Sequence, residues 1–210
     1  MSTHDLILQR PASPSQLVLL FHGVGSSARN LAPLGEALAP QLPGAAIVSV
    51  QAPDAAGPGW QWFSVQGITE ANRPARVASA MARFTQTVQE WQTACAVGPE
   101  LTTLIGFSQG AIMALESTQL EDPVAQRVIA IAGRFARRPR FAHAAVRTHL
   151  MHGDADHIMP VQGAVDALAQ LQALGAMVTL DRFPGLGHGI DGRVVEATLR
   201  QLGGMAQASS

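Results

Sequence analysis

Residues 102–116 read TTLIGFSQGAIMALE, and this stretch decides the fold. An apolar run typical of a buried strand (101–107) is followed directly by a segment with the composition of a helix (108–118). Ser108 lies between them in the pattern G-x-S-x-G, with Gly106 and Gly110 two residues away on either side. This pattern is typical of a nucleophilic serine on a sharp strand-to-helix turn, where larger side chains at the glycine positions would collide. The alternative is that Ser108 only caps the helix.

Short apolar runs alternate with longer amphipathic segments along the rest of the chain. Runs that are apolar throughout indicate strands buried on both faces, as in a parallel sheet covered by helices. The runs predicted as strands are 16–21, 45–53, 101–107, 127–133, 147–153 and 177–183. The segments predicted as helices are 26–42, 72–97, 108–118, 161–175 and 190–205. We therefore predict an α/β fold, with a mostly parallel central sheet and helices on both faces.

The chain has 210 residues, which fits one domain with a substantial core. We predict a single domain over 1–210, in which 1–14 and 204–210 are loosely ordered. Only about a dozen residues connect the runs 127–133 and 147–153. Because that connection is too short for a helical lid, we expect no inserted lid domain.

Composition excludes several classes of function. The formal net charge of -1 argues against a nucleic-acid or anionic-membrane partner. The sequence has no Lys and no Tyr, which removes Schiff-base lysines, Ser–Lys dyads and tyrosine acids. Cys95 is the only cysteine, so an intrachain disulfide and a CxxC site are excluded. The polar start and the lack of a long apolar run predict a cytoplasmic protein without a signal peptide or membrane span.

A nucleophilic serine needs a histidine to take its proton, and the sequence contains seven. His22 and His152 each precede a glycine at a strand end. A histidine in that position more often shapes the loop than acts as the general base. His188 lies in the loop after the last strand, between Gly187 and Gly189, which lets its ring reach over the sheet. We therefore predict His188 as the general base.

The segment HGDADHIMP (152–160) offers two carboxylates to orient this histidine. Asp154 directly follows a glycine and is placed to stabilise the turn. Asp156 lies deeper in the loop, so we favour Asp156 and keep Asp154 as the alternative. The order Ser108, Asp156, His188 is that of the α/β-hydrolases.

Catalysis through a serine also needs two donors for the developing oxyanion. The backbone N–H of Gln109, next to the nucleophile, is one candidate. The backbone N–H of Val24, in the HGVG motif (22–25) after an early strand, is the other. Because both are backbone groups, we expect truncation of these two side chains to be less harmful than loss of Ser108.

The motifs FHGVG (21–25), GFSQGAIMAL (106–115), HGDADHIMP (152–160) and GHGID (187–191) together resemble the phospholipase/carboxylesterase family of α/β-hydrolases. This family includes the acyl-protein thioesterases, and the resemblance runs from about residue 15 to residue 202. It implies an α/β-hydrolase fold, with Ser108 as nucleophile, Asp156 as acid and His188 as base. It also implies an oxyanion N–H at Val24.

The chain departs from the thioesterase pattern at two positions. The thioesterases usually read HGLGD and WFD, whereas Ser26 and Ser64 replace the acidic residues here. A substrate preference therefore cannot be transferred from them.

Two further segments have competing interpretations. Trp60, Trp62 and Phe63 lie in a Gly- and Pro-rich segment (54–70) without periodicity. Trp62 and Phe63 are candidate substrate-binding residues, and the alternative is that these rings pack the loop onto the sheet. The segment RFARRPR (134–140) either meets an anionic substrate or partner, or forms a solvated surface turn.

We predict a serine carboxylesterase that hydrolyses short- to medium-chain esters through an acyl-enzyme intermediate, without cofactor or metal. The expected partner is a small-molecule ester or thioester, and a homodimer is compatible with the sequence. One alternative is an acyl-protein thioesterase or lysophospholipase acting on long acyl chains. A less favoured alternative is a catalytically inactive receptor for small ligands. The cluster of His and Asp at 152–157 matches no metal-ligand spacing.

Overall fold

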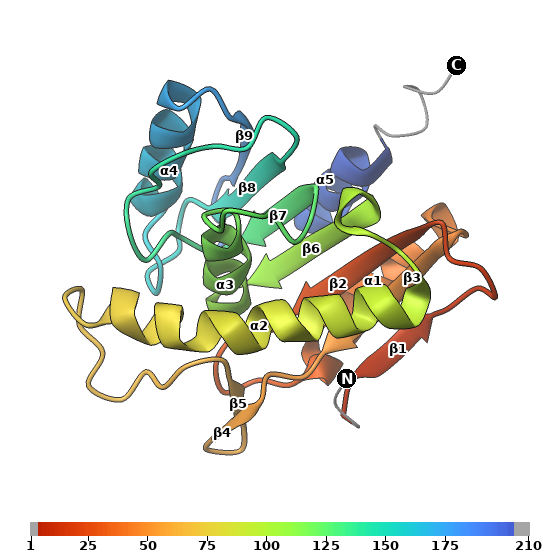
Figure 1. Cartoon of the computed structure of the whole chain (residues 1–210). Coiled ribbons are helices and arrows are strands. Elements are labelled where there is room, and N and C mark those ends of the chain that lie inside the picture. Colours follow the sequence, from red (N-terminus) through yellow and green to blue (C-terminus); the bar gives the residue numbers. More distant parts are fainter. Residues whose placement is uncertain (1–3, 204–210) are drawn as a thin grey trace.

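A seven-stranded sheet forms the centre of the computed structural model, which describes residues 4–203 (Figure 1). Its strands are β1 (Leu6–Gln9), β2 (Gln16–Phe21), β3 (Ala45–Val50), β6 (Thr102–Phe107), β7 (Arg127–Ile131), β8 (Arg147–Gly153) and β9 (Met177–Phe183). The spatial order is β1-β3-β2-β6-β7-β8-β9. β1 is antiparallel to β3, and every other neighbouring pair is parallel. The predicted mostly parallel sheet is confirmed.

Helices cover both faces of this sheet. They are α1 (Ala32–Leu38), α2 (Arg73–Cys95), α3 (Gln109–Ser117), α4 (Gln162–Ala173) and α5 (Gly192–Gly203), with short 3-10 turns η1 (Ala28–Leu31), η2 (Ala39–Gln41) and η3 (Pro99–Leu101). Alternate strand residues point to opposite faces, so the sheet contributes to two apolar layers. One layer packs against α2, α3 and α4, and the other against α1 and α5 (Figure 1).

The N-terminal segment differs from its prediction. The sequence predicts loose order over 1–14, which is wrong for β1 and the residues beside it, and 1–3 lie outside the described residues. The Gln9 side chain donates from Nε2 to the carbonyls of Leu42 (2.6 Å) and Ala45 (2.9 Å). The Asp5 carboxylate accepts the backbone N–H of Gln51 at 2.9 Å. These long-range partners hold a strand that is too short to show periodicity. The tail 204–210 lies outside the described residues.

The segment predicted as an irregular loop (54–70) contains a small antiparallel hairpin, formed by β4 (Asp54–Ala56) and β5 (Gly59–Gln61). Gly25 donates its N–H to the carbonyl of Trp60 at 2.9 Å, and Trp60 donates its N–H to that of Ser26 at 2.8 Å. The hairpin is therefore fastened to the loop that follows β2. Three-residue strands give no periodic signal, which is why the sequence did not reveal them.

The connection between β7 and β8 contains no helix or strand, in agreement with the expected lack of an inserted lid. Within residues 4–203, none of the helices combines the length and the hydropathy needed to cross a lipid bilayer.

Candidate active site

Ser108 occupies a sharp turn between β6 and α3, with a backbone conformation of φ 53° and ψ -113°. A non-glycine residue adopts such a conformation only where its surroundings enforce it. A Cβ on Gly106 would overlap the backbone of Gly110 and Ala111, and a Cβ on Gly110 would overlap the carbonyl oxygen of Phe21. The two glycines therefore allow the turn to fit against the sheet, as the G-x-S-x-G pattern predicts.

A chain of hydrogen bonds connects this serine with the loops after β9 and β8. The Ser108 hydroxyl donates to Nε2 of His188 at 2.9 Å. Nδ1–H of His188 donates to Oδ2 of Asp156 at 2.7 Å. The Asp156 side chain is fully buried, and the His188 side chain is 18% exposed. The structure thus brings together three residues that lie 80 and 32 positions apart in the sequence.

Asp156 is held by its own loop as well as by the histidine. Its Oδ1 accepts the backbone N–H groups of Ile158 (2.9 Å) and Met159 (2.8 Å). Burial alone would raise the pKa of the Asp156 carboxyl, but the hydrogen bonds from Met159 and His188 outweigh it, so the pKa is lowered. The carboxylate therefore stays ionised at neutral pH.

Asp154, the alternative acid, faces elsewhere. Its Oδ1 accepts a hydrogen bond from Nε of Arg182 at 2.8 Å, in a solvent-accessible ion pair. Because Asp154 contacts Arg182 whereas Asp156 contacts His188, the geometry separates the two candidates in favour of Asp156.

The other two histidines at strand ends shape loops, as expected. His22 is buried, donates from Nδ1 to the Gly23 carbonyl (2.7 Å) and accepts the Ala52 N–H at Nε2 (3.1 Å). Burial lowers the pKa of His22, so its ring is neutral. His152 donates from Nε2 to the carbonyl of Met159 at 2.6 Å and thereby supports the loop that carries Asp156.

Val24 and Gln109, whose backbone N–H groups are predicted to donate to the oxyanion, line the same cavity as Ser108. Gln109 is the first residue of α3, so its N–H has no acceptor within the helix. Val24 lines the same cavity from the loop after β2. That loop lies close to the nucleophile, since a Cβ on Gly23 would be only 3.1 Å from Cβ of Ser108.

The side chain of Gln109 has a role that the sequence did not indicate. Its Oε1 accepts the N–H of Trp62 at 2.7 Å, and its Nε2 donates to the carbonyl of Phe63 at 2.8 Å. Both bonds are buried and span more than 40 residues of sequence. They fasten the loop after the β4–β5 hairpin to the turn that holds Ser108.

The two aromatic residues predicted to bind substrate, Trp62 and Phe63, differ in whether they line the cavity beside Ser108. Phe63 lines the cavity beside Ser108. Trp62 is 3% exposed, and its ring packs against Phe21 (5.9 Å between ring centres) and Phe84 (5.1 Å). The Trp62 indole therefore packs in the core beneath the loop and does not line the cavity beside Ser108, so its role in substrate binding stays a prediction.

The cavity beside Ser108 has a volume of about 370 Å³. Apolar side chains form most of its wall, and Ser108, Gln109 and a group of charged side chains form the rest. The lining residues are Val24, Phe63, Val65, Glu70, Arg73, Ser108, Gln109, Ile112, Arg134, Ile158, Met159 and Pro160.

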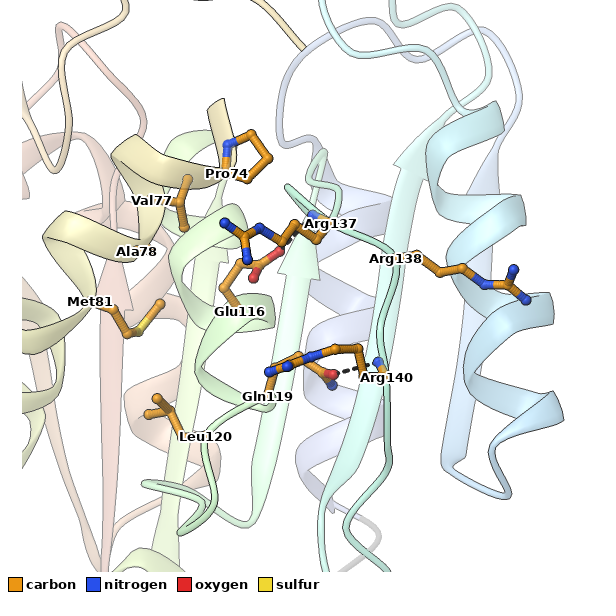
Figure 2. Close-up of a pocket in the computed structure, with 10 residues that line it drawn as sticks. All are labelled: Pro74, Val77, Ala78, Met81, Glu116, Gln119, Leu120, Arg137, Arg138 and Arg140. Atoms are coloured by element: carbon orange, nitrogen blue, oxygen red, sulfur yellow. Dashed lines mark hydrogen bonds between the residues drawn. The ribbon is translucent and has the colours of Figure 1, made fainter. Parts of the chain in front are cut away.

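The arginine-rich segment 134–140 divides between two cavities. Arg134 lines the one beside Ser108. A second cavity, of about 240 Å³, lies between α2, α3 and this segment, and is lined by Arg137, Arg138 and Arg140 (Figure 2). There Glu116 accepts the N–H of Arg137, and Arg138 points away toward α4 (Figure 2). Of the arginines in segment 134–140, only Arg134 therefore lines the cavity beside the serine.

No group of three or more His, Cys, Asp or Glu side chains within residues 4–203 is arranged to hold a metal ion. His152 and Asp156 come within 3.4 Å of each other, but both belong to the network around His188.

A serine on a strained strand-to-helix turn, at the carboxyl edge of a mostly parallel sheet, defines the fold as that of an α/β-hydrolase. A family model described as Phospholipase/Carboxylesterase matches residues 3–203. The chain belongs to this family, and it is a serine hydrolase that acts on carboxylic esters.

Individual relatives agree with this assignment. The chain is 47% identical to Esterase YpfH of Escherichia coli (strain K12) over 203 residues, which cover 95% of this chain and 88% of YpfH. The crystal structure of esterase PE8 superimposes with a TM-score of 0.83 at 30% identity, covering 90% of this chain and 92% of PE8. A carboxylesterase from Bacillus cereus shares the fold, with a TM-score of 0.80 at 18% identity over 94% of this chain and 92% of that one.

Proposed function

We propose that this chain is a serine carboxylesterase that hydrolyses short- to medium-chain esters through an acyl-enzyme on Ser108. The observation that carries the proposal is the pair of hydrogen bonds that link Ser108, His188 and Asp156 at 2.9 and 2.7 Å. These distances lie within the range needed for proton transfer between a nucleophile and its base.

The reaction has two halves. His188 accepts the hydroxyl proton at Nε2 while Ser108 Oγ attacks the ester carbonyl, and Asp156 stabilises the imidazolium that forms. The N–H groups of Val24 and Gln109 stabilise the oxyanion, each typically contributing about 10²–10³ in kcat. His188 then gives the proton to the departing alcohol. In the second half, His188 activates a water molecule, which releases the acid and restores Ser108.

The size and exposure of the cavity support a small acyl group. Its volume of about 370 Å³ is at the lower end for small-molecule sites. Val24, Val65 and Ile158 are 36%, 39% and 73% exposed, so its apolar mouth is open to solvent. A long acyl chain would extend beyond this mouth into water.

A second candidate is a thioesterase or lysophospholipase that acts on long acyl chains. The exposed Ile158 favours it, because this side chain extends the apolar surface beyond the cavity. Comparing p-nitrophenyl esters from C2 to C16 separates the two candidates. Peak kcat/KM between C2 and C6 supports the first, and a peak between C12 and C16 supports the second.

Labelling with a fluorophosphonate probe tests the proposal as a whole. The probe should modify the wild-type protein and the exposed-serine control Ser13→Ala, but not Ser108→Ala. Equal labelling of all three proteins would exclude Ser108 as the nucleophile. A wild-type protein that binds esters without labelling or turnover would instead indicate the inactive receptor.

A further inference from the structure

Two arginines and one glutamate from two separate segments meet at the wall of the cavity beside Ser108. Arg134 follows β7, Arg73 begins α2, and Glu70 lies in the preceding turn. Oε1 of Glu70 accepts Nη2–H of Arg134 at 2.6 Å and Nη2–H of Arg73 at 3.2 Å. All three residues line the cavity, and they are the only Asp, Glu, Lys or Arg residues that do so within residues 4–203.

This group has more positive charge and more donors than Glu70 can use. Two guanidinium ions face one carboxylate, which leaves a net charge of +1. Each guanidinium has five N–H groups, and the single oxygen Oε1 takes one from each. Nε of Arg73 is buried and has no hydrogen-bond partner in the described part of the chain. Unused donors on two adjacent guanidinium groups are the usual basis for binding a second carboxylate.

Glu70 is the accessible member of the group. Its side chain is 74% exposed, whereas those of Arg73 and Arg134 are 17% and 29% exposed. The hydrogen bond from Arg134 lowers the pKa of Glu70, so the carboxylate is ionised at neutral pH. The two arginine side chains are thus more buried than the carboxylate between them, which can turn out into solvent at little cost.

Two other arginines, one from each of these segments, do not line the cavity beside Ser108. Arg76 donates from Nη1 to the carbonyls of Ser64 (2.6 Å) and Gln66 (2.7 Å), and so holds the loop in place. Arg137 lines the second cavity. The positive charge available to a molecule attached at Ser108 is therefore that of Arg73 and Arg134.

We infer that the preferred substrates are esters bearing a second, free carboxylate, which Arg134 and Arg73 bind in place of Glu70. This inference rests on the proposed function and names its substrate class. The apolar wall takes the hydrocarbon part, and the arginine pair takes the anionic end. A neutral ester of the same length has no carboxylate for Arg134 and Arg73 to bind, so the two arginines do not strengthen its binding.

Matched neutral and anionic esters test the inference. Acyl-side recognition is measured with p-nitrophenyl butyrate and mono-p-nitrophenyl glutarate, and alcohol-side recognition with phenyl butyrate and 4-carboxyphenyl butyrate. The measured quantity is the ratio of kcat/KM for the anionic ester to that for its neutral counterpart. Comparing the ratio between variants cancels the intrinsic reactivity of each ester.

We expect Arg134→Met to lower this ratio about tenfold for at least one pair, and Arg134→Lys to restore part of it. Glu70→Gln should raise the ratio, because it removes the competing carboxylate. Arg137→Met, which removes the same charge from the second cavity, should leave the ratio unchanged. An unchanged ratio in Arg134→Met and Glu70→Gln for both pairs overturns the inference.

Binding to Ser108→Ala distinguishes failure of the inference from failure of the proposed function. Calorimetry with monomethyl glutarate should detect binding to Ser108→Ala and a loss of it in Ser108→Ala/Arg134→Met. If binding follows this pattern but the wild type hydrolyses no ester, the proposed function is wrong and the carboxylate site stands. If the wild type hydrolyses esters and Ser108→Ala binds equally with and without Arg134, the inference is wrong.

Discussion

The Asp156 carboxylate accepts Nδ1–H of His188 at 2.7 Å, and both partners come from loops that follow neighbouring parallel strands. The backbone amides of Ile158 and Met159 fix the other carboxylate oxygen. Orientation of the histidine ring therefore depends on a buried carboxylate that cannot rotate freely.

Replacing Asp156 by Asn should reduce kcat by about 10⁴ while the fold is retained, because an amide no longer fixes the histidine tautomer. The measurement is p-nitrophenyl butyrate hydrolysis, alongside circular dichroism as a check of folding. Asp154→Asn is the matched control, since Asp154 contacts Arg182 instead. Similar losses in the two variants would contradict the assignment of Asp156.

The Gln109 side chain should matter more than that of Val24. Gln109→Ala leaves the N–H of Trp62 and the carbonyl of Phe63 buried without partners, at a cost of about 1–3 kcal/mol for each group. We expect reduced stability in urea unfolding and a lower kcat/KM, because Phe63 lines the cavity. Val24→Ala keeps its backbone amide and should show smaller losses in both measurements.

Gln61→Ala is the control for that comparison. Its side chain makes one exposed hydrogen bond, to the carbonyl of Ala55. A loss of stability in Gln61→Ala equal to that in Gln109→Ala would show that the buried bonds are not the cause.

Gly110→Ala should prevent a stable fold or destabilise it by about 3 kcal/mol or more, because the added Cβ would overlap the Phe21 carbonyl of the neighbouring strand. Gly192→Ala, at the start of α5, introduces a Cβ with no atom within 4 Å and should have little effect. Thermal unfolding compares the two variants. Equal melting temperatures would mean that the turn at Ser108 can relax more than its geometry indicates.

His149 should make the protein less stable as the pH falls from about 6.5 to about 4. Burial, and secondarily the charge of Arg127, lowers the pKa of His149 to about 4. Between these pH values the unfolded chain binds a proton that the folded chain does not, so stability rises with pH in this window. The full difference is on the order of 3 kcal/mol.

His149→Leu should therefore flatten this part of the stability–pH curve, measured by urea unfolding at several pH values. The exposed His157→Asn is the control and should keep the wild-type slope. If the slope in His149→Leu matches that of the wild type, another group is responsible for the acid sensitivity.

Local chemistry was sufficient to predict most of the fold. Continuous apolar runs such as 16–21 and 101–107 specify buried parallel strands, and the steric demand of a serine turn specifies Gly106 and Gly110. No signal in the sequence indicated β1, because this four-residue strand is held by its pairing with β3 and by the Gln9 side chain, whose partners lie more than 30 positions away. The hairpin β4–β5 was missed for a similar reason.

The sequence by itself determined which residues are chemically able to form a nucleophile, a base and an acid, because type, flanking glycines and chain order are local properties. Only the tertiary structure decided that Asp156 rather than Asp154 faces His188, and that the Trp62 ring lies in the core. It also brought Glu70, Arg73 and Arg134 to one wall of the cavity. These outcomes depend on how separate loops meet at the sheet edge, and such packing is not encoded in any single segment.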